Sequence, residues 1–271
     1  MLSILNSVTS LQAENALSNT TTALNKNLEQ LSTGLRINSG SDDAAGLSIA
    51  NGLQANIAGL TQSSNNASDG VGMLQTADGA LSQVTTLLNR AVTLATEAAN
   101  GGLSSTQSTA LQTEYTSIQA EIDNIGKTTD FNGTAVFGSS GSIFESDGTT
   151  SGTISDAVSA LSSKDLGLTT SGSPLSTTAG AQAELTLIDT AVNTVAEDRG
   201  TIGATVNQLT ASQTVDSAAV TNLTSAEDSI QNADVGQVVA QMTQNNVLEQ
   251  TGMAALSQSN QMQQNVLKLL Q

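Results

Sequence analysis

Small aliphatic residues recur along this chain at alternating steps of four and three, and this spacing limits the fold more than any other feature. Steps of this kind average 3.5 residues, which keeps one apolar face turned toward a partner along a helix of any length. The clearest run is Ala77, Leu81, Val84, Leu88, Ala91, Ala95 and Ala98. Similar runs are Ala50, Leu53, Ile57 and Leu60; Leu111, Tyr115, Ile118, Ile122 and Ile125; and Leu185, Ile188, Val192, Val195, Arg199, Ile202, Val206 and Leu209. The spacing predicts long, coiled-coil-like helices.

Proline and aromatic residues are too rare for an ordinary globular domain. Pro174 is the one proline among 271 residues, so helices can run almost uninterrupted. Aromatic residues make up 1% of the chain, whereas globular cores normally depend on them. Asn100-Gly101-Gly102 predicts the end of a helix that begins near Asp43, and Ser104-Ser105 predicts the cap of the next one. The first of these helices would be roughly 80 Å long, so we expect an elongated body.

Charge and composition exclude several classes of function. Seven basic residues against 24 acidic ones give a net charge of −17, which is unsuited to nucleic acid or an anionic membrane surface. The chain has no His and no Cys, which removes catalytic triads, imidazole and thiolate metal ligands, and disulfides. Its apolar runs are too short to cross a bilayer. We therefore expect no enzyme, no cofactor, no metal and no membrane insertion.

Both ends of the chain predict amphipathic helices that need partners. Leucines follow a heptad-like spacing near the N-terminus, and the C-terminus ends in Val266-Leu267-Lys268-Leu269-Leu270. Neither apolar stripe is wide enough to support an isolated helix in water. We expect each end to pack on the other and on copies in neighbouring subunits. Residues 1–6 lack the basic-then-apolar pattern of a cleaved signal peptide, so we expect a cytosolic protein or one exported by another route.

The segment between the helices differs in composition. Asn132-Gly133 and the Gly138–Gly141 tetrapeptide are turn signals beside short apolar runs, and they predict one or two small hairpins within residues 132–181. The stretch from Leu168 to Gly180 is rich in Ser, Thr and Gly around Pro174, and it predicts an exposed loop.

Two groups of short segments carry a family resemblance. The N-terminal part contains Leu31–Ser39, Asp42–Gly46, Ile49–Asn51, Gly59–Gln62, Asn66–Gly70 and Phe131–Gly133. The C-terminal part contains Leu223–Ala226, Ala233-Asp234, Gln250–Gly252 and Gln264–Leu267. In content and order these segments resemble the two ends of bacterial flagellins, over about residues 1–137 and 183–271. The resemblance has departures, among them Glu227-Asp228, Gln208 and Gln263-Gln264, where many flagellins have other residues.

The resemblance implies a mainly α fold of long antiparallel helices with a small β-hairpin region in the middle of the chain. It implies an inner terminal coiled coil of residues 1–42 and 232–271, a helical rod domain of residues 43–137 and 181–231, and a short variable surface region of residues 138–180. The implied function is a subunit that self-assembles into the flagellar filament, which is extracellular and whose subunits are exported without a cleaved signal peptide. Implied partners are copies of the chain, the flagellar export apparatus, a flagellin chaperone, the filament cap and the hook-associated proteins.

Two sets of residues follow from these expectations. Self-assembly contacts are expected at Leu17, Leu24, Leu28, Leu31, Leu35, Arg36, Leu256, Val266, Leu267 and Leu270. The resemblance also implies a patch at Arg90, Leu94 and Glu114, by which a Toll-like innate immune receptor recognises some flagellins. For Leu94, the alternative is an apolar position beside the Ala91 and Ala95 seam.

Alternatives remain for the function and for some polar residues. The function alternatives are a hook–filament junction protein, and a cell-surface glycan- or cation-binding protein on a flagellin scaffold. Asp42-Asp43 is expected at a helix N-terminus rather than as a catalytic carboxylate pair. Gly126-Lys127-Thr128 resembles the end of a phosphate-binding loop, but Glu121 stands where the first glycine is required. Arg199 either extends its aliphatic stem to the edge of the seam or pairs in the interior with an acid of a neighbouring helix.

Overall fold

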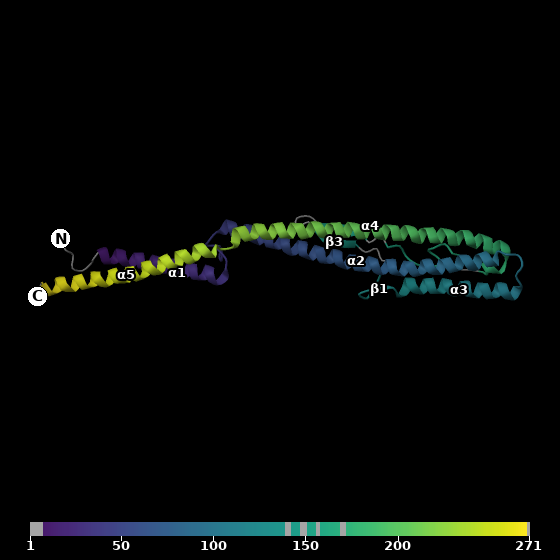
Figure 1. Cartoon of the computed structure of the whole chain (residues 1–271), viewed down its shortest axis with the longest axis horizontal. Coiled ribbons are helices and arrows are strands. Elements are labelled where there is room, and N and C mark those ends of the chain that lie inside the picture. Colours follow the sequence, from purple (N-terminus) through teal and green to yellow (C-terminus); the bar gives the residue numbers. More distant parts are fainter. Residues whose placement is uncertain (1–7, 139–141, 147–150, 156–157, 169–171, 270–271) are drawn as a thin grey trace. The chain divides into compact units, whose positions relative to one another are not determined.

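The structure is a computed structural model that describes residues 8–138, 142–146, 151–155, 158–168 and 172–269. Within these residues the chain forms five long α-helices, two short hairpins and one 3-10 turn (Figure 1). The helices are α1 (Val8–Thr33), α2 (Ala44–Ala98), α3 (Ser105–Thr128), α4 (Thr178–Gln231) and α5 (Val235–Leu269). The strands are β1 (Asp130–Phe131), β2 (Thr134–Ala135), β3 (Ser142–Ser146) and β4 (Ser151–Ser155), and the 3-10 turn is η1 (Pro174–Ser176). The mainly α class with small central hairpins is confirmed.

The chain divides into two compact units. The first, here called the terminal unit, contains residues 1–55 and 222–271. The second, here called the central unit, contains residues 56–221. Helices α2 and α4 each contribute residues to both units.

In the terminal unit, α1 and α5 lie side by side and run in opposite directions (Figure 1). The hydroxyls of Ser10 and Ser259 share a hydrogen bond of 2.7 Å at one end of the pair. Further along, the side chain of Leu17 packs against Gly252, where an added Cβ would lie 3.5 Å from Leu17 Cδ1. The two ends of the chain therefore form an antiparallel helix pair.

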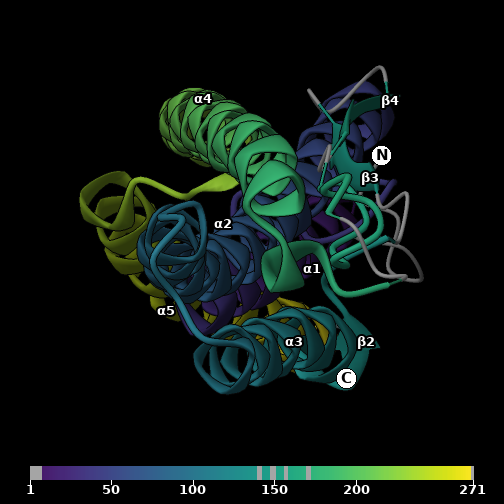
Figure 2. The same cartoon turned by 90° about the vertical axis from the view of Figure 1, so that its right-hand side faces the viewer.

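In the central unit, the apolar runs predicted from the sequence form the core. All seven residues of the run from Ala77 to Ala98 are buried, and so are Tyr115, Ile118 and Ile122 of α3. The α4 residues Ile188, Val195, Ile202 and Leu209 are 2% exposed or less. Alternate steps of four and three thus bury one face of each helix against the others, and α2, α3 and α4 are seen end-on in Figure 2.

Local sequence signals account for the helix ends and for one hairpin. Helix α2 ends at Ala98, beside Asn100-Gly101-Gly102, and Ser104 caps α3 in a reciprocal capping box with Gln107. Asn132 and Gly133 both have positive φ (52° and 77°) and form the turn between β1 and β2. The second hairpin pairs Ile143 with Ile154. The predicted Gly138–Gly141 turn lies partly outside the described residues.

The expectation of an exposed loop from Leu168 to Gly180 is wrong for its apolar residues. Leu168 is 4% exposed and Leu175 is fully buried. The amide of Leu175 donates to Gln112 Oε1 (2.8 Å), which holds η1 against α3. Helix α4 then begins at Thr178, seven residues before the predicted Leu185 run. The cause is non-local, because the apolar partner of Leu175 is a helix about 60 residues earlier in the chain.

Hydropathy along the described helices gives no membrane span: none is both long enough and apolar enough to cross a bilayer.

Candidate functional site

Exposed apolar side chains gather on the terminal unit. Among the described residues, thirteen large apolar side chains are exposed, and ten of them belong to this unit. On α1 they are Val8, Leu11 and Leu28; on the first turns of α2, Ile49; and on α5, Val235, Val239, Val247, Leu248, Met253 and Met262. We call these ten residues the apolar surface of the terminal unit. Exposed apolar side chains of this kind gain free energy when another protein covers them.

The terminal unit has almost no core of its own. Of the thirty buried apolar residues in the described part of the chain, this unit supplies Ile37, Ala50 and Val238. The main apolar cluster of the chain runs from Ala67 to Leu209 and so lies wholly in the central unit. A unit with three buried apolar residues and ten exposed ones lacks the burial that stabilises ordinary domains.

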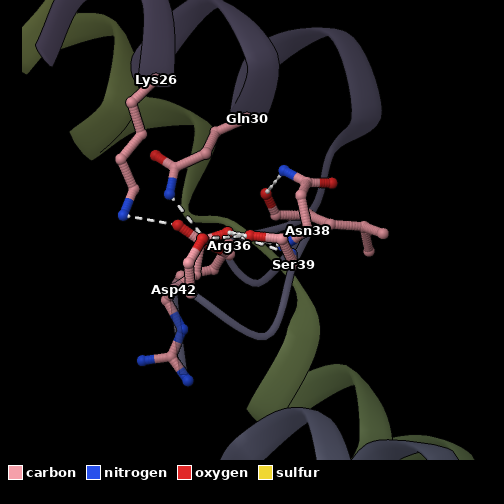
Figure 3. Close-up of polar contacts among 8 residues, drawn as sticks. Lys26, Gln30, Arg36, Asn38, Ser39 and Asp42 are labelled. Carbon is pink, nitrogen blue, oxygen red and sulfur yellow. Dashed lines mark hydrogen bonds and ion pairs between the residues drawn. The ribbon is translucent and has the colours of Figure 1, made fainter. Parts of the chain in front are cut away.

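Polar contacts around Asp42 fix the connection between α1 and α2 (Figure 3). Asp42 Oδ1 accepts from Lys26 Nζ at 2.7 Å, and Asp42 Oδ2 accepts from the backbone amides of Asn38 and Ser39. The hydrogen bond from Lys26, followed by that from the Ser39 hydroxyl, lowers the pKa of Asp42 to about 2. Asp43 plays a different part, because its Oδ1 accepts from the amide of Gly46 and caps α2. The expectation that this Asp pair marks a helix start therefore holds for Asp43, while Asp42 fixes the preceding turn.

Arg36 joins the same connection to the junction between α4 and α5. Its guanidinium donates to the carbonyl of Ile230 at 2.6 Å, and its amide donates to the carbonyl of Gln231 at 2.7 Å. Beside it, Leu35 and Asn232 form an isolated antiparallel bridge. The guanidinium thus meets a carbonyl at the C-terminal end of α4, where a positive charge is favoured.

The predicted self-assembly residues fall into three groups. Leu28 and Arg36 are exposed, and Leu28 is one of the apolar surface residues. The half-buried ones are Leu17, Leu24, Leu31, Leu35 and Leu256. The side chains of Val266 and Leu267, and all of Leu270, lie outside the described residues. Sequence reasoning missed the valines and methionines of α5, although Val235, Val239 and Met242 already follow steps of four and three.

The predicted receptor patch is brought together only in part. Arg90 Nε on α2 donates to Glu114 Oε1 on α3 at 2.7 Å, and both side chains are about half exposed. This hydrogen bond lowers the pKa of Glu114 and raises that of Arg90. Leu94 is fully buried beside Ala91 and Ala95, which is its alternative, apolar-core position.

Arg199 combines features of both expectations. Its Nε and Nη2 donate to the two carboxylate oxygens of Asp78 on α2, at 2.7 and 3.3 Å. The pair is formed with an acid of a neighbouring helix, but the Arg199 side chain is 37% exposed. The hydrogen bond to Asp78 raises the pKa of Arg199. The pair borders an open groove of about 580 Å³ that is also lined by Gly79, Gly200 and Gly203.

A second polar contact lies inside the central unit. The hydroxyl of Tyr115 donates a short hydrogen bond to Oε1 of Glu184, and both residues are buried. Burial, reinforced by this hydrogen bond, raises the pKa of Tyr115 well above its ordinary value of 10. Sequence reasoning placed Tyr115 in the seam but found no signal for its partner.

The described residues contain no cluster of three or more His, Cys, Asp and Glu side chains that could hold a metal ion. The apolar surface of the terminal unit is the main candidate for function, because its exposed apolar side chains suit association with other helices.

Comparisons with known proteins match nearly the whole chain. Residues 4–142 match the family model for the bacterial flagellin N-terminal helical region, and residues 185–270 match that for the C-terminal helical region. A flagellin of Bacillus subtilis (strain 168) is 34% identical over 297 aligned residues, covering 97% of this chain and 98% of the relative. A flagellin of Halalkalibacterium halodurans is 35% identical, covering 90% of this chain and 91% of the relative. The crystal structure of Bacillus cereus flagellin aligns with a TM-score of 0.47 and 30% identity, over 56% of this chain and 88% of that one.

Proposed function

This chain belongs to the bacterial flagellin family, and on that premise we propose that copies of it bind one another through the apolar surface of the terminal unit. Members of the family are structural proteins that build the extracellular flagellar filament. The function is accordingly that of a filament subunit in motility. The relatives bear the name flagellin at nearly full length, and they favour neither the hook–filament junction protein nor the surface-binding protein.

The observation that carries the proposal is the imbalance between exposed and buried apolar residues in the terminal unit. Burying the exposed half of one Val, Leu or Met side chain contributes roughly 1 kcal/mol. Ten such residues give a total on the order of 10 kcal/mol per subunit. This energy becomes available only when other copies cover the surface, and it offsets the entropy lost on association.

We propose that folding of the terminal helices is coupled to assembly. Ordering a helix with few buried contacts costs conformational entropy, which contact with neighbouring copies offsets. Disordered ends in the exported monomer would then become helical at the growing end of the filament. Export without a cleaved signal peptide, and the chaperone, cap and hook-associated proteins as partners, are proposed from family membership alone.

The proposed domain division assigns residues 1–42 and 232–271 to an inner coiled coil, residues 43–137 and 181–231 to a helical rod, and residues 138–180 to a surface region. The division is supported by the two compact units, one of which joins both ends of the chain. Recognition of Arg90 and Glu114 by an innate immune receptor also stays a proposal. It is supported by the exposure of their ion pair, whereas the buried Leu94 would act only by supporting α2.

The experiment compares two matched substitutions of exposed valines. Val247 on α5 is 55% exposed and belongs to the apolar surface, while Val215 on α4 is 67% exposed and lies in the central unit. The purified chain is dissociated with acid, returned to neutral pH with precipitating salt and examined by sedimentation and negative-stain microscopy. We expect V247D to raise the critical concentration at least about tenfold, because an unpaired charge at an interface costs more than about 1.4 kcal/mol.

V215D should assemble like the unchanged chain. Equal critical concentrations for V247D and the unchanged chain would contradict the proposal, and so would equal losses in both variants. A chain lacking residues 1–41 and 233–271 provides a second check, since it should stay soluble, helical and unassembled.

A further inference from the structure

Among the residues that the structure describes, the terminal unit contains one buried side-chain donor that has no hydrogen-bond partner. It is Nδ2 of Asn27, on α1. Asn27 is 6% exposed, so it is more buried than any leucine of the same helix. A buried amide donor without a partner costs free energy that the folded state must offset elsewhere. The burial of Asn27 therefore needs a physical explanation.

Asn27 belongs to the face of α1 that packs on α5. Leu17 contacts Gly252, and the two helices run in opposite directions with the same rise per residue. Ten residues further along, this register sets Asn27 opposite Met242, which is half-buried. A thioether sulfur is only a weak acceptor, so this part of α5 offers the amide of Asn27 no good partner.

The same face repeats along α1 at alternating steps of three and four. Its buried and half-buried members are Ala13, Leu17, Thr20, Leu24, Asn27 and Leu31. The hydroxyl of Thr20 is satisfied locally, because it donates to the carbonyl of Ala16 at 2.9 Å. Leu28, next to Asn27, is 49% exposed, although turning α1 by one residue would bury it in place of Asn27. The observed packing thus buries a polar residue and leaves a leucine free for contacts with other copies.

We propose that Asn27 keeps the α1–α5 pair weak, so that the pair is mostly open in the free subunit and closes when neighbouring copies cover the apolar surface of the terminal unit. The inference rests on the proposed coupling of folding to assembly, and it assigns the control of that coupling to one side chain. In the open pair, water satisfies the amide of Asn27.

The size of the effect follows from the unpaired donor. Burying the amide of Asn27 without a partner shifts the equilibrium toward the open pair by about 5- to 100-fold. A buried asparagine at a seam position lowers the stability of coiled coils in the same way. The terminal unit has three buried apolar residues among those described, so it has little burial with which to offset this shift.

The test compares full-length monomers below their critical concentration. Two variants remove the unpaired donor: N27L has the branched shape of asparagine without a polar atom, and N27S carries a hydroxyl that can donate to the carbonyl one turn back, as that of Thr20 does. The matched controls are N25L and N25S, which make the same replacements at Asn25, an exposed position of the same helix. They therefore change helix propensity and composition equally.

Far-ultraviolet circular dichroism measures the helix content, and hydrogen exchange with mass spectrometry measures the protection of α1 and α5. We expect N27L and N27S to be more helical than their controls, with a gain of up to the 26 residues of α1 and the 35 of α5. Exchange in these helices should slow at least about tenfold in N27L. The critical concentration for assembly should fall at least about threefold, because a closed pair loses less entropy on binding.

Equal helix content and exchange in all five proteins would overturn the proposal, because the buried amide would then have no effect on the pair. A loss of helix in both N27L and N27S would also overturn it, since Asn27 would then stabilise the pair. A closed pair with an unchanged critical concentration would overturn the role of Asn27 in assembly. The proposed interface fails separately, because V247D tests it in filaments whereas the monomer measurements involve no assembly.

Discussion

Replacing Gly126 with alanine tests the packing of α3, because packing and helix propensity predict opposite changes in stability. Gly126 lies in α3, and a Cβ added there would be 1.9 Å from the backbone carbonyl oxygen of Leu161. A comfortable C···O contact is about 3.3 Å or more, so the segment around Leu161 would have to move by about 1.4 Å. This oxygen belongs to the backbone and has no flexible side chain through which to yield.

The magnitude follows from two opposing effects. Alanine in place of glycine stabilises a helix by roughly 0.5–1 kcal/mol. Overpacking a tight contact costs about 1–3 kcal/mol, and a clash with backbone lies toward the upper end. The net expectation for G126A is a loss of about 1–2 kcal/mol, which lowers the melting temperature of a chain this size by about 2–6 °C.

Gly79 provides the matched control. It lies in α2 of the same unit, and an added Cβ would meet no atom within 4 Å. G79A should therefore raise the melting temperature slightly, by the helix-propensity gain alone. Thermal unfolding followed by far-ultraviolet circular dichroism measures both variants. A G126A chain that melts at or above the unchanged protein would refute the assigned contact with Leu161.

Three further predictions concern charge and titration. Because the folded-state pKa of Asp42 is lowered to about 2 from 3.8, the stability that Asp42 contributes is present above pH 3.8 and is lost as the pH falls toward 2. Thermal melts of D42N should therefore lack this part of the acid destabilisation. If D42N and the unchanged chain lose stability equally with acid, the stabilising contact between Lys26 and Asp42 is contradicted. Tyr115 is the one tyrosine and there is no Trp, so ultraviolet absorbance of the phenolate reports on a single side chain, which should ionise only well above pH 10, together with unfolding. Y115F should lower the free energy of unfolding by about 1–3 kcal/mol, because it removes a hydrogen-bond donor from the buried Glu184. A urea midpoint equal to that of the unchanged chain would argue against this. The net charge of −17 makes the subunits repel one another, and raising NaCl from about 0.01 to 0.1 M shortens the Debye length from about 30 to 10 Å. The added salt should therefore lower the critical concentration for assembly. A sedimentation assay in which salt raises that concentration would contradict mutual repulsion of the subunits.

Local patterns predicted the helices because their causes are local. The seam from Ala77 to Ala98 is wholly buried as its spacing requires, and the glycines after Asn100 and the hydroxyl of Ser104 act at the predicted ends. The Asn132-Gly133 turn is of the same kind, since two residues of positive φ suffice to define it. Such features depend on a few neighbouring residues and are therefore visible in one sequence.

The missed features depend on contacts between distant segments. Leu175 is buried because α3 passes beside it, and nothing near Pro174 in the sequence reports that. The sequence could not identify the partner of Arg199 for the same reason, since the register between α2 and α4 selects Asp78 among several acidic residues. The apolar surface of α5 was underestimated because valine and methionine at half-exposed positions form a weaker pattern than the leucines of α1.

The pair of Arg199 and Asp78 also bears on how the long helices find their alignment. A seam of Ala, Leu and Val repeated every seven residues packs almost as well after a slip of seven, so apolar contacts alone distinguish poorly between alignments. A slip in either direction would set Arg199 opposite Val71 or Thr85 and leave both charges unpaired. The pair contributes little to stability at its exposure, but it penalises every alignment except the native one. The pair would thereby keep the folding chain from forming long-lived, misaligned helices.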